Sequence, residues 1–188
     1  MEAKETLHHY LRRQRDSLVG KLDGLSERDV RWPATPTGTN LLGLVKHVAS
    51  VQLGYFGEVF DRPSGRAMPW LDDGAEVNAD MWASAEESRA DIVALHRFSA
   101  AHADATIDAL GLEATGSVPW WPAERRRVTL HQILVHMCVE TARHAGHADI
   151  VRELLAGAVP TDDPNVPDQS AAEWAAYRQR LETVAELA

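Results

Sequence analysis

Apolar side chains recur at helical spacing along four long segments of the chain, residues 4–25, 41–60, 84–111 and 129–155. The first segment shows the pattern most simply, because its leucines follow one face of a helix: Leu7, Leu11, Leu18, Leu22 and Leu25. No segment alternates apolar and polar residues as a half-buried strand does. Four amphipathic helices, each with one face to bury, predict an all-α protein built as a four-helix bundle.

Capping residues mark the expected starts of these helices. Polar N-cap residues precede the second helix, at Thr39 or Asn40, and the fourth helix, at Thr129. The third helix is expected to begin at Ser84, because Glu87 three residues later completes the spacing of a capping box.

A short additional helix is expected at the C-terminus. Gly157 ends the fourth helix, and residues 158–188 supply a polar link and a terminal helix that Ser170 can cap. The apolar residues of this helix again share one face: Trp174, Tyr177, Leu181 and Val184. We expect one domain over residues 1–188, with its core in about residues 1–157 and the terminal helix packed on its outside.

Charge and composition argue against several classes of protein. The chain has 19 Lys and Arg against 28 Asp and Glu, and Arg125–Arg127 is its one basic run, so nucleic-acid binding is not expected. No apolar run reaches the roughly 18 residues of a membrane span, and the N-terminus lacks a signal peptide. The protein is therefore expected to be cytoplasmic and not membrane-bound. A single cysteine, Cys138, excludes a disulfide framework within the chain.

Three polar residues interrupt apolar stripes that should face the core. His47 lies between Leu44 and Val51 on the stripe of the second helix. Glu140 and His144 lie one turn apart on the stripe of the fourth helix. A carboxylate and two imidazoles are costly to bury unless something pairs them, and a divalent metal ion would do so. We therefore predict a metal site formed by His47, Glu140 and His144. A hydrogen-bonded core histidine and a buried Glu–His ion pair are the alternatives.

The ligand set suits more than one metal ion. Zinc is expected first, while two histidines and one carboxylate also suit ferrous iron, and nickel is a further alternative. His147 falls in the same arc of the fourth helix, where it could orient a ligand or act as an acid or base. Five tryptophans are candidates for the walls of the bundle's mouth: Trp32, Trp70, Trp82, Trp120 and Trp121.

Two segments that carry these residues, 39–60 and 129–157, resemble the DinB-like superfamily. They are most similar to the actinobacterial branch that includes the N-terminal domain of mycothiol-dependent maleylpyruvate isomerases. The superfamily motif on the fourth helix is commonly His-x-x-x-His, followed by a basic residue, Gly and Gln. In this chain Glu140 stands at the first His of that motif and His147 at the Gln. The isomerase branch also uses His, Glu and His, so the resemblance implies a metal at the same three residues.

The resemblance implies a function as well as a fold. It implies a metal-dependent transferase or isomerase that uses a low-molecular-weight thiol. We expect the metal to activate this thiol as a bound thiolate that reacts with a small electrophilic substrate. The resemblance also implies a homodimer. Because nearly all basic residues are arginines, a composition typical of a GC-rich genome, mycothiol is favoured over bacillithiol. The isomerases carry a second domain after the bundle, whereas about thirty residues follow Gly157 here, so we do not expect maleylpyruvate isomerase activity itself.

Two other functions fit the same residues. A metal-bound water would make the protein a hydrolase, although the chain lacks the HExxH pattern. A stress-response bundle that binds a metal or a small ligand without catalysis is the second alternative.

Overall fold

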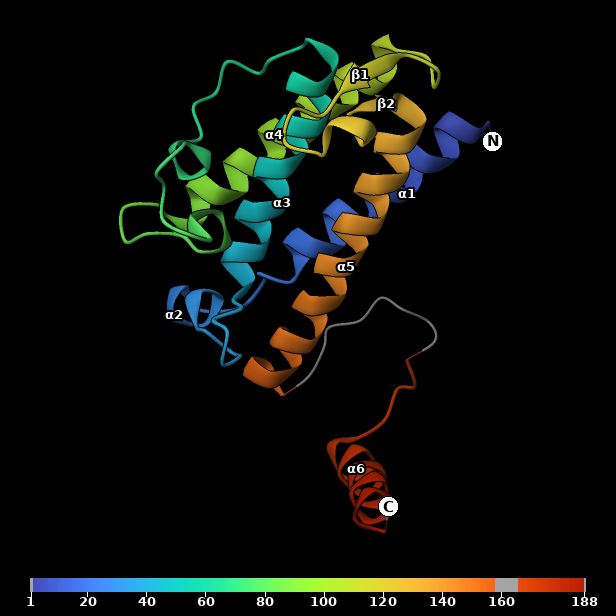
Figure 1. Cartoon of the computed structure of the whole chain (residues 1–188). Coiled ribbons are helices and arrows are strands. Elements are labelled where there is room, and N and C mark those ends of the chain that lie inside the picture. The colour runs from blue at the N-terminus through green and yellow to red at the C-terminus, as the bar shows by residue number, and fades with distance from the viewer. Residues whose placement is uncertain (1, 158–165, 188) are drawn as a thin grey trace.

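The computed structural model describes residues 2–157 and 166–187 of the chain (Figure 1). The predicted all-α fold is confirmed, with two short strands beside the helices. The four long helices of the bundle are α1 (Ala3–Gly20), α3 (Leu41–Phe56), α4 (Arg89–Ala109) and α5 (Leu130–Ala156). The shorter helix α2 (Glu27–Arg31) precedes α3, and α6 (Ala171–Glu186) follows the bundle.

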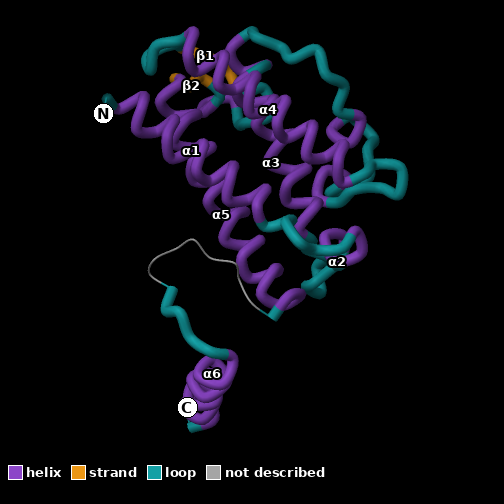
Figure 2. Tube along the Cα trace, turned by 180° about the vertical axis from the view of Figure 1, so that it is seen from behind, coloured by secondary structure: helices purple, strands orange, loops and turns teal. Residues whose placement is uncertain are grey.

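The helix α3 contacts both α4 and α5. The helix α1 contacts α5 and α4 in turn, which closes the bundle (Figure 2). The predicted stripes supply the core, with Leu11, Leu18, Leu44, Val48 and Ile133 all at most 1% exposed. The contact between α3 and α5 places the helix that carries His47 against the helix that carries Glu140 and His144.

Local capping explains why α3 and α5 begin where they do. The side chain of Asn40 accepts a hydrogen bond from the backbone N–H of Gly43, at 2.7 Å. Thr129 and Gln132 form a capping box at the start of α5. Gly157 ends α5 in the left-handed conformation, with φ of 70°, which glycine adopts without steric cost.

The prediction that the third long helix begins at Ser84 is wrong. The helix α4 begins at Arg89, and the capping box at its start is formed by Ser88 and Asp91. The carboxylate of Glu87 does accept a hydrogen bond from the N–H of Ser84, at 2.8 Å, as a capping box requires. The same carboxylate also binds the ammonium of Lys46 on α3, at 2.8 Å. A tertiary ion pair therefore holds residues 84–87 in a turn before the helix.

Two strands of three residues were not expected from the sequence. The strands β1 (Thr115–Ser117) and β2 (Arg127–Thr129) pair antiparallel, with Gly116 opposite Val128. They are too short for an alternating pattern to be seen. Gly116 is needed at this position because a Cβ atom there would lie 2.4 Å from the carbonyl oxygen of Val59.

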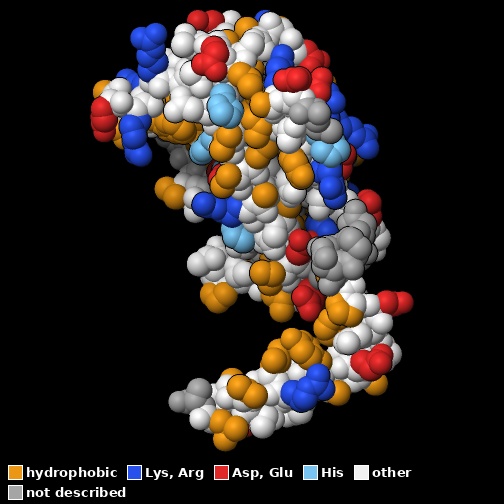
Figure 3. Space-filling model, turned by 90° about the vertical axis from the view of Figure 1, so that its right-hand side faces the viewer, with side chains coloured by type: hydrophobic (Ala, Val, Ile, Leu, Met, Phe, Trp, Pro, Cys, Tyr) orange, Lys and Arg blue, Asp and Glu red, His pale blue; other side chains and the backbone are white. Residues whose placement is uncertain are grey.

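The helix α6 does not pack on the outside of the bundle as expected. Every described residue of α6 is exposed, including its apolar stripe: Trp174, Tyr177, Leu181 and Val184. Figure 3 shows hydrophobic side chains at the surface of α6 as well as on one side of the bundle. Among the described residues, no helix is both long and apolar enough to cross a membrane.

A buried polar network lies between α1, α3 and α4. The guanidinium of Arg15, 2% exposed, donates hydrogen bonds to Gln52, at 2.5 Å, and to Asp104, at 2.6 Å. His8 also contacts the Asp104 carboxylate, at 2.7 Å. His96 is buried in the same region, and burial together with the positive charges of Arg15 and Arg97 lowers the pKa of its imidazole to about 4. The His96 imidazole is therefore neutral at pH 7.

Candidate metal centre

The three residues predicted as metal ligands meet between α3 and α5. His47 comes from α3, whereas Glu140 and His144 come from successive turns of α5. One ligand atom from each residue can be chosen so that all three lie within 4.8 Å of one another. The carboxylate oxygen Oε1 of Glu140 lies 3.1 Å from Nε2 of His144 and 3.4 Å from Nε2 of His47. His144 is buried and the other two side chains are half-buried, so the cluster is open to solvent on one side.

A fourth residue, Asp80, completes the cluster and was missed by the sequence reasoning. Its carboxylate oxygen Oδ2 lies 2.6 Å from Nδ1 of His47. Asp80 belongs to a single 3₁₀ turn, Ala79–Met81, within the long connection between α3 and α4. That connection has no apolar periodicity, so nothing in the sequence indicated which of its polar residues turns inward.

The contact with Asp80 determines how the imidazole of His47 is protonated. Because Nδ1 faces a carboxylate oxygen at hydrogen-bond distance, Nδ1 carries the proton of the neutral ring. Nε2 then has only a lone pair, and this lone pair faces the Glu140 oxygen. Two acceptor atoms face each other there, so a proton or a cation must lie between them for the arrangement to be favourable.

The pKa directions of the cluster agree with this need for positive charge. Burial lowers the pKa of His47, but the hydrogen bonds and charges of Asp80 and Glu140 outweigh burial and raise it above the ordinary value. Burial and the neighbouring His47 lower the pKa of His144. Burial would raise the pKa of Glu140, but the charges and hydrogen bonds of His144 and His47 lower it. These shifts favour an ionised carboxylate on Glu140 and a protonated imidazole on His47, and they disfavour a second protonated imidazole on His144.

The donor set fits a divalent metal ion. Two imidazole nitrogens and a carboxylate oxygen are common ligands of zinc and of ferrous iron. A carboxylate that binds the far nitrogen of a ligating histidine, as Asp80 does for His47, is the usual support of such a ligand. Three protein ligands would also leave at least one coordination position for a substrate.

His147 lies next to the cluster. Its Nδ1 is 3.4 Å from Nδ1 of His144, and the two rings meet edge to face with centroids 5.3 Å apart. His147 itself is exposed, as are Arg143 and His131. His147 therefore lies between the buried ring of His144 and the solvent.

An aromatic cluster, defined here as Tyr55, Trp120, Trp121 and His136, lies further along the same two helices. The hydroxyl of Tyr55 accepts a hydrogen bond from the indole N–H of Trp121, at 3.0 Å. The Tyr55 and His136 rings meet edge to face, with centroids 4.6 Å apart. Because His136 precedes Glu140 by four residues on α5, the aromatic cluster begins about 6 Å along the helix axis from Glu140.

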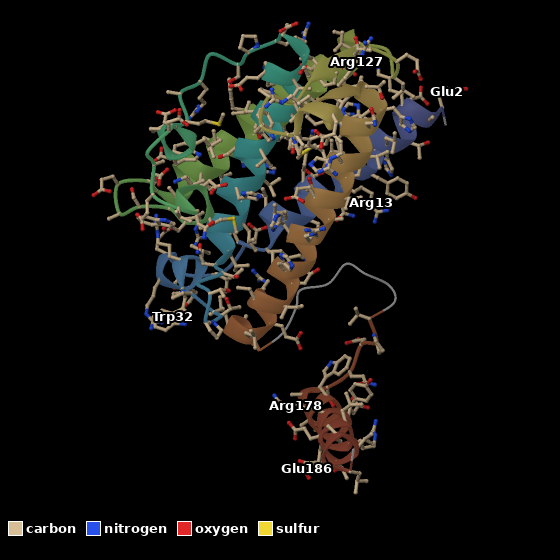
Figure 4. All side chains as sticks on the ribbon, in the orientation of Figure 1. Glu2, Arg13, Trp32, Arg127, Arg178 and Glu186 are labelled. Atoms are coloured by element: carbon tan, nitrogen blue, oxygen red, sulfur yellow. The ribbon has the colours of Figure 1, made fainter. Side chains whose placement is uncertain are left out.

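The other three of the five candidate tryptophans do not join this cluster, contrary to the expectation of a common wall. Trp70 and Trp82 line a separate cavity of about 450 Å³ beside Lys46. Trp32 lies beside α2, at the end of the bundle opposite Arg127 and the strands (Figure 4). Burial raises the pKa of the Cys138 thiol, which makes this cysteine a poor nucleophile.

Comparisons with known proteins relate the chain to a known family. The model of a family described as mycothiol-S-transferase matches residues 6–157, which include α3, α4, α5, most of α1 and the three candidate ligands. No protein of curated function matches the chain. Among solved structures, the fold resembles that of a conserved protein from Enterococcus faecalis, with a TM-score of 0.59 and 17% sequence identity. That alignment covers 84% of this chain and 99% of the other, and it supports the fold alone.

Proposed function

The chain belongs to the mycothiol S-transferase family, and on this premise we propose that it joins the sulfur of mycothiol to a small electrophile, using a divalent metal ion, zinc in the first place, held by His47, Glu140 and His144. The observation that carries the proposal is the convergence of Nε2 of His47 and Nε2 of His144 on one carboxylate oxygen of Glu140, at 3.4 Å and 3.1 Å. This convergence of electron-pair donors from two helices suits a cation better than it suits a purely structural contact.

The residues of the site have separate roles in the proposed reaction. His47, Glu140 and His144 would hold the metal ion, and Asp80 orients His47. When bound, the metal ion supplies the positive charge that favours the thiolate form of a coordinating thiol at neutral pH. The sulfur would form a C–S bond to an electrophilic carbon while the bond from that carbon to its leaving group breaks, and the leaving group would keep the electron pair. The thiol proton would go to solvent or to the leaving group.

The electrophile would bind beside the aromatic cluster. Tyr55 lies on α3 and His136 on α5, the two helices that carry the candidate ligands, whereas Trp120 and Trp121 come from the connection between β1 and β2. Apolar and aromatic walls bind small organic molecules and exclude water from a reacting thiolate. Burial lowers the pKa of His136, which favours the neutral form of its imidazole at pH 7.

Thermal unfolding in the presence of different thiols tests the proposal. Mycothiol at 100 times its Kd is expected to stabilise the zinc-loaded protein by about 2.7 kcal/mol. For a chain of this size that corresponds to a rise of roughly 5–10 °C in melting temperature. Bacillithiol, glutathione and cysteine, at the same concentration, are expected to give smaller shifts, and removal of the metal should abolish the response to mycothiol.

Matched variants on α5 make the test specific. His144→Ala removes a proposed ligand and should abolish the mycothiol shift, whereas His131→Ala, at an exposed position of the same helix, should leave it intact. A full shift in the metal-free protein would contradict the role of the metal. No shift with any thiol in the zinc-loaded protein would favour a binding bundle without transferase activity.

A further inference from the structure

The turn that carries Asp80 is held onto α3 by three residues of that helix's N-terminal half. The side-chain N–H of Asn40 donates to the carbonyl oxygen of Met81, at 3.2 Å. Gly43 allows the turn to approach closely, because a Cβ atom there would lie 1.7 Å from the same carbonyl oxygen. The third residue, Lys46, is the one that reaches both sides of Asp80.

Lys46 has a buried ammonium group whose hydrogen bonds are all directed at this segment and its continuation. The residue is 3% exposed. Its Nζ donates to the carbonyl oxygens of Ala79 and Trp82, each at 3.0 Å, and to the carboxylate of Glu87, at 2.8 Å. An ammonium has three donors, so all of them are used. The Glu87 carboxylate balances the buried charge, which would otherwise be costly.

The two carbonyl groups that Lys46 binds lie on either side of Asp80 in the sequence. A cation that holds Ala79 and Trp82 together fixes the backbone between them, and with it the position of the Asp80 carboxylate. That carboxylate is 2.6 Å from Nδ1 of His47, the residue that follows Lys46 on α3. Lys46 and His47, which are adjacent on α3, therefore both bind this turn. Lys46 binds carbonyl groups of its backbone, and His47 binds the side chain of Asp80.

We propose that Lys46 is a positioning residue for the metal centre, which holds Asp80 on His47 and so keeps Nε2 of His47 directed at Glu140 and His144. The inference rests on the proposed function, because it requires a metal ion at those three residues. Carboxylates that orient a ligating histidine typically contribute 10–100-fold to metal affinity. All three donors of Lys46 are used, so it makes no hydrogen bond to a candidate ligand, and its expected effect on affinity is through the position of Asp80.

Zinc affinity of the full-length chain, measured by competition with a chromophoric chelator, tests the inference in a double-mutant cycle. Asp80→Ala is expected to weaken zinc binding by about 10–100-fold. Lys46→Met is expected to weaken it by about 10-fold in the wild-type background and by less than about 2-fold in the Asp80→Ala background. If Lys46→Met weakens zinc binding in the wild type but hardly at all in the Asp80→Ala background, Lys46 acts through Asp80. Equal losses in the two backgrounds would overturn the inference.

Two further variants separate positioning from general stability. Lys21→Met removes another buried ammonium, which pairs with Asp149 at 2.6 Å, and should leave zinc affinity unchanged. Gly43→Ala displaces the turn without removing a charge, so it should reproduce the Lys46→Met loss and the same dependence on Asp80, even where Lys46→Met does not fold. Failure of the wild type to bind zinc overturns the proposed function itself. Wild-type binding with undiminished affinity in both Lys46→Met and Gly43→Ala overturns only the role of Lys46.

Discussion

Glu140→Ala is expected to weaken zinc binding by more than about 100-fold while the protein stays folded. The loss should exceed that of a supporting carboxylate, because Glu140 would contact the metal directly. Alanine suits the interior of α5, and the change also removes a half-buried carboxylate that needs a cation. The measurement is the melting temperature of wild type and variant, each with and without chelator. The chelator should lower the melting temperature of the wild type and leave that of Glu140→Ala nearly unchanged.

The matched control is Glu153→Ala, which removes an exposed carboxylate from the same helix and should keep the chelator response of the wild type. A purely structural ion pair predicts a different result. Loss of Glu140 would then strand His47 and His144 and lower the melting temperature strongly, and the chelator would affect neither protein.

Acid is expected to cost the metal-free protein about 3 kcal/mol of folding free energy through His96 alone, between pH 6.5 and pH 4. The pKa of His96 is lowered to about 4, from 6.5, by burial and by the charges of Arg15 and Arg97. Below pH 6.5 the unfolded chain therefore binds a proton that the folded chain does not, and stability falls until the pH reaches the folded-state pKa. The stabilising contribution of Asp104, whose pKa is lowered from an ordinary value of 3.8, is lost only at lower pH.

Urea unfolding of the wild type and His96→Leu at pH 7 and pH 4 measures this contribution. The Nε2 atom of His96 has no hydrogen-bond partner among the described residues, so leucine strands no partner of that nitrogen. The wild type should lose about 3 kcal/mol more than the variant between the two pH values. Equal losses in both proteins would mean that His96 titrates normally in the fold.

The convergence of His47, Glu140 and His144 could be expected from the sequence because helix periodicity alone fixes which face a residue occupies. Each residue lies on an apolar stripe, and two stripes that share a core must face each other. The position of Asp80 could not be expected in this way. It depends on contacts that Lys46 and Gly43 make with a turn more than thirty residues away in the chain.

The errors in helix limits have a similar origin. Ser84 and Glu87 have the local pattern of a helix start, but the Glu87 carboxylate also pairs with Lys46, a contact that no local pattern contains. The apolar stripe of α6 correctly indicated a helix, beginning at Ala171. An apolar stripe shows which face of a helix can be buried, but it does not show which part of the protein covers that face.

Diffraction at the zinc absorption edge, from crystals of the zinc-loaded chain, tests the proposed metal centre most directly. We expect a strong anomalous peak between α3 and α5, with one donor atom each of His47, Glu140 and His144 about 2.0–2.2 Å from it. An anomalous map with no peak between these three residues, or with the zinc bound only elsewhere on the chain, would contradict the metal centre and the transferase chemistry built on it.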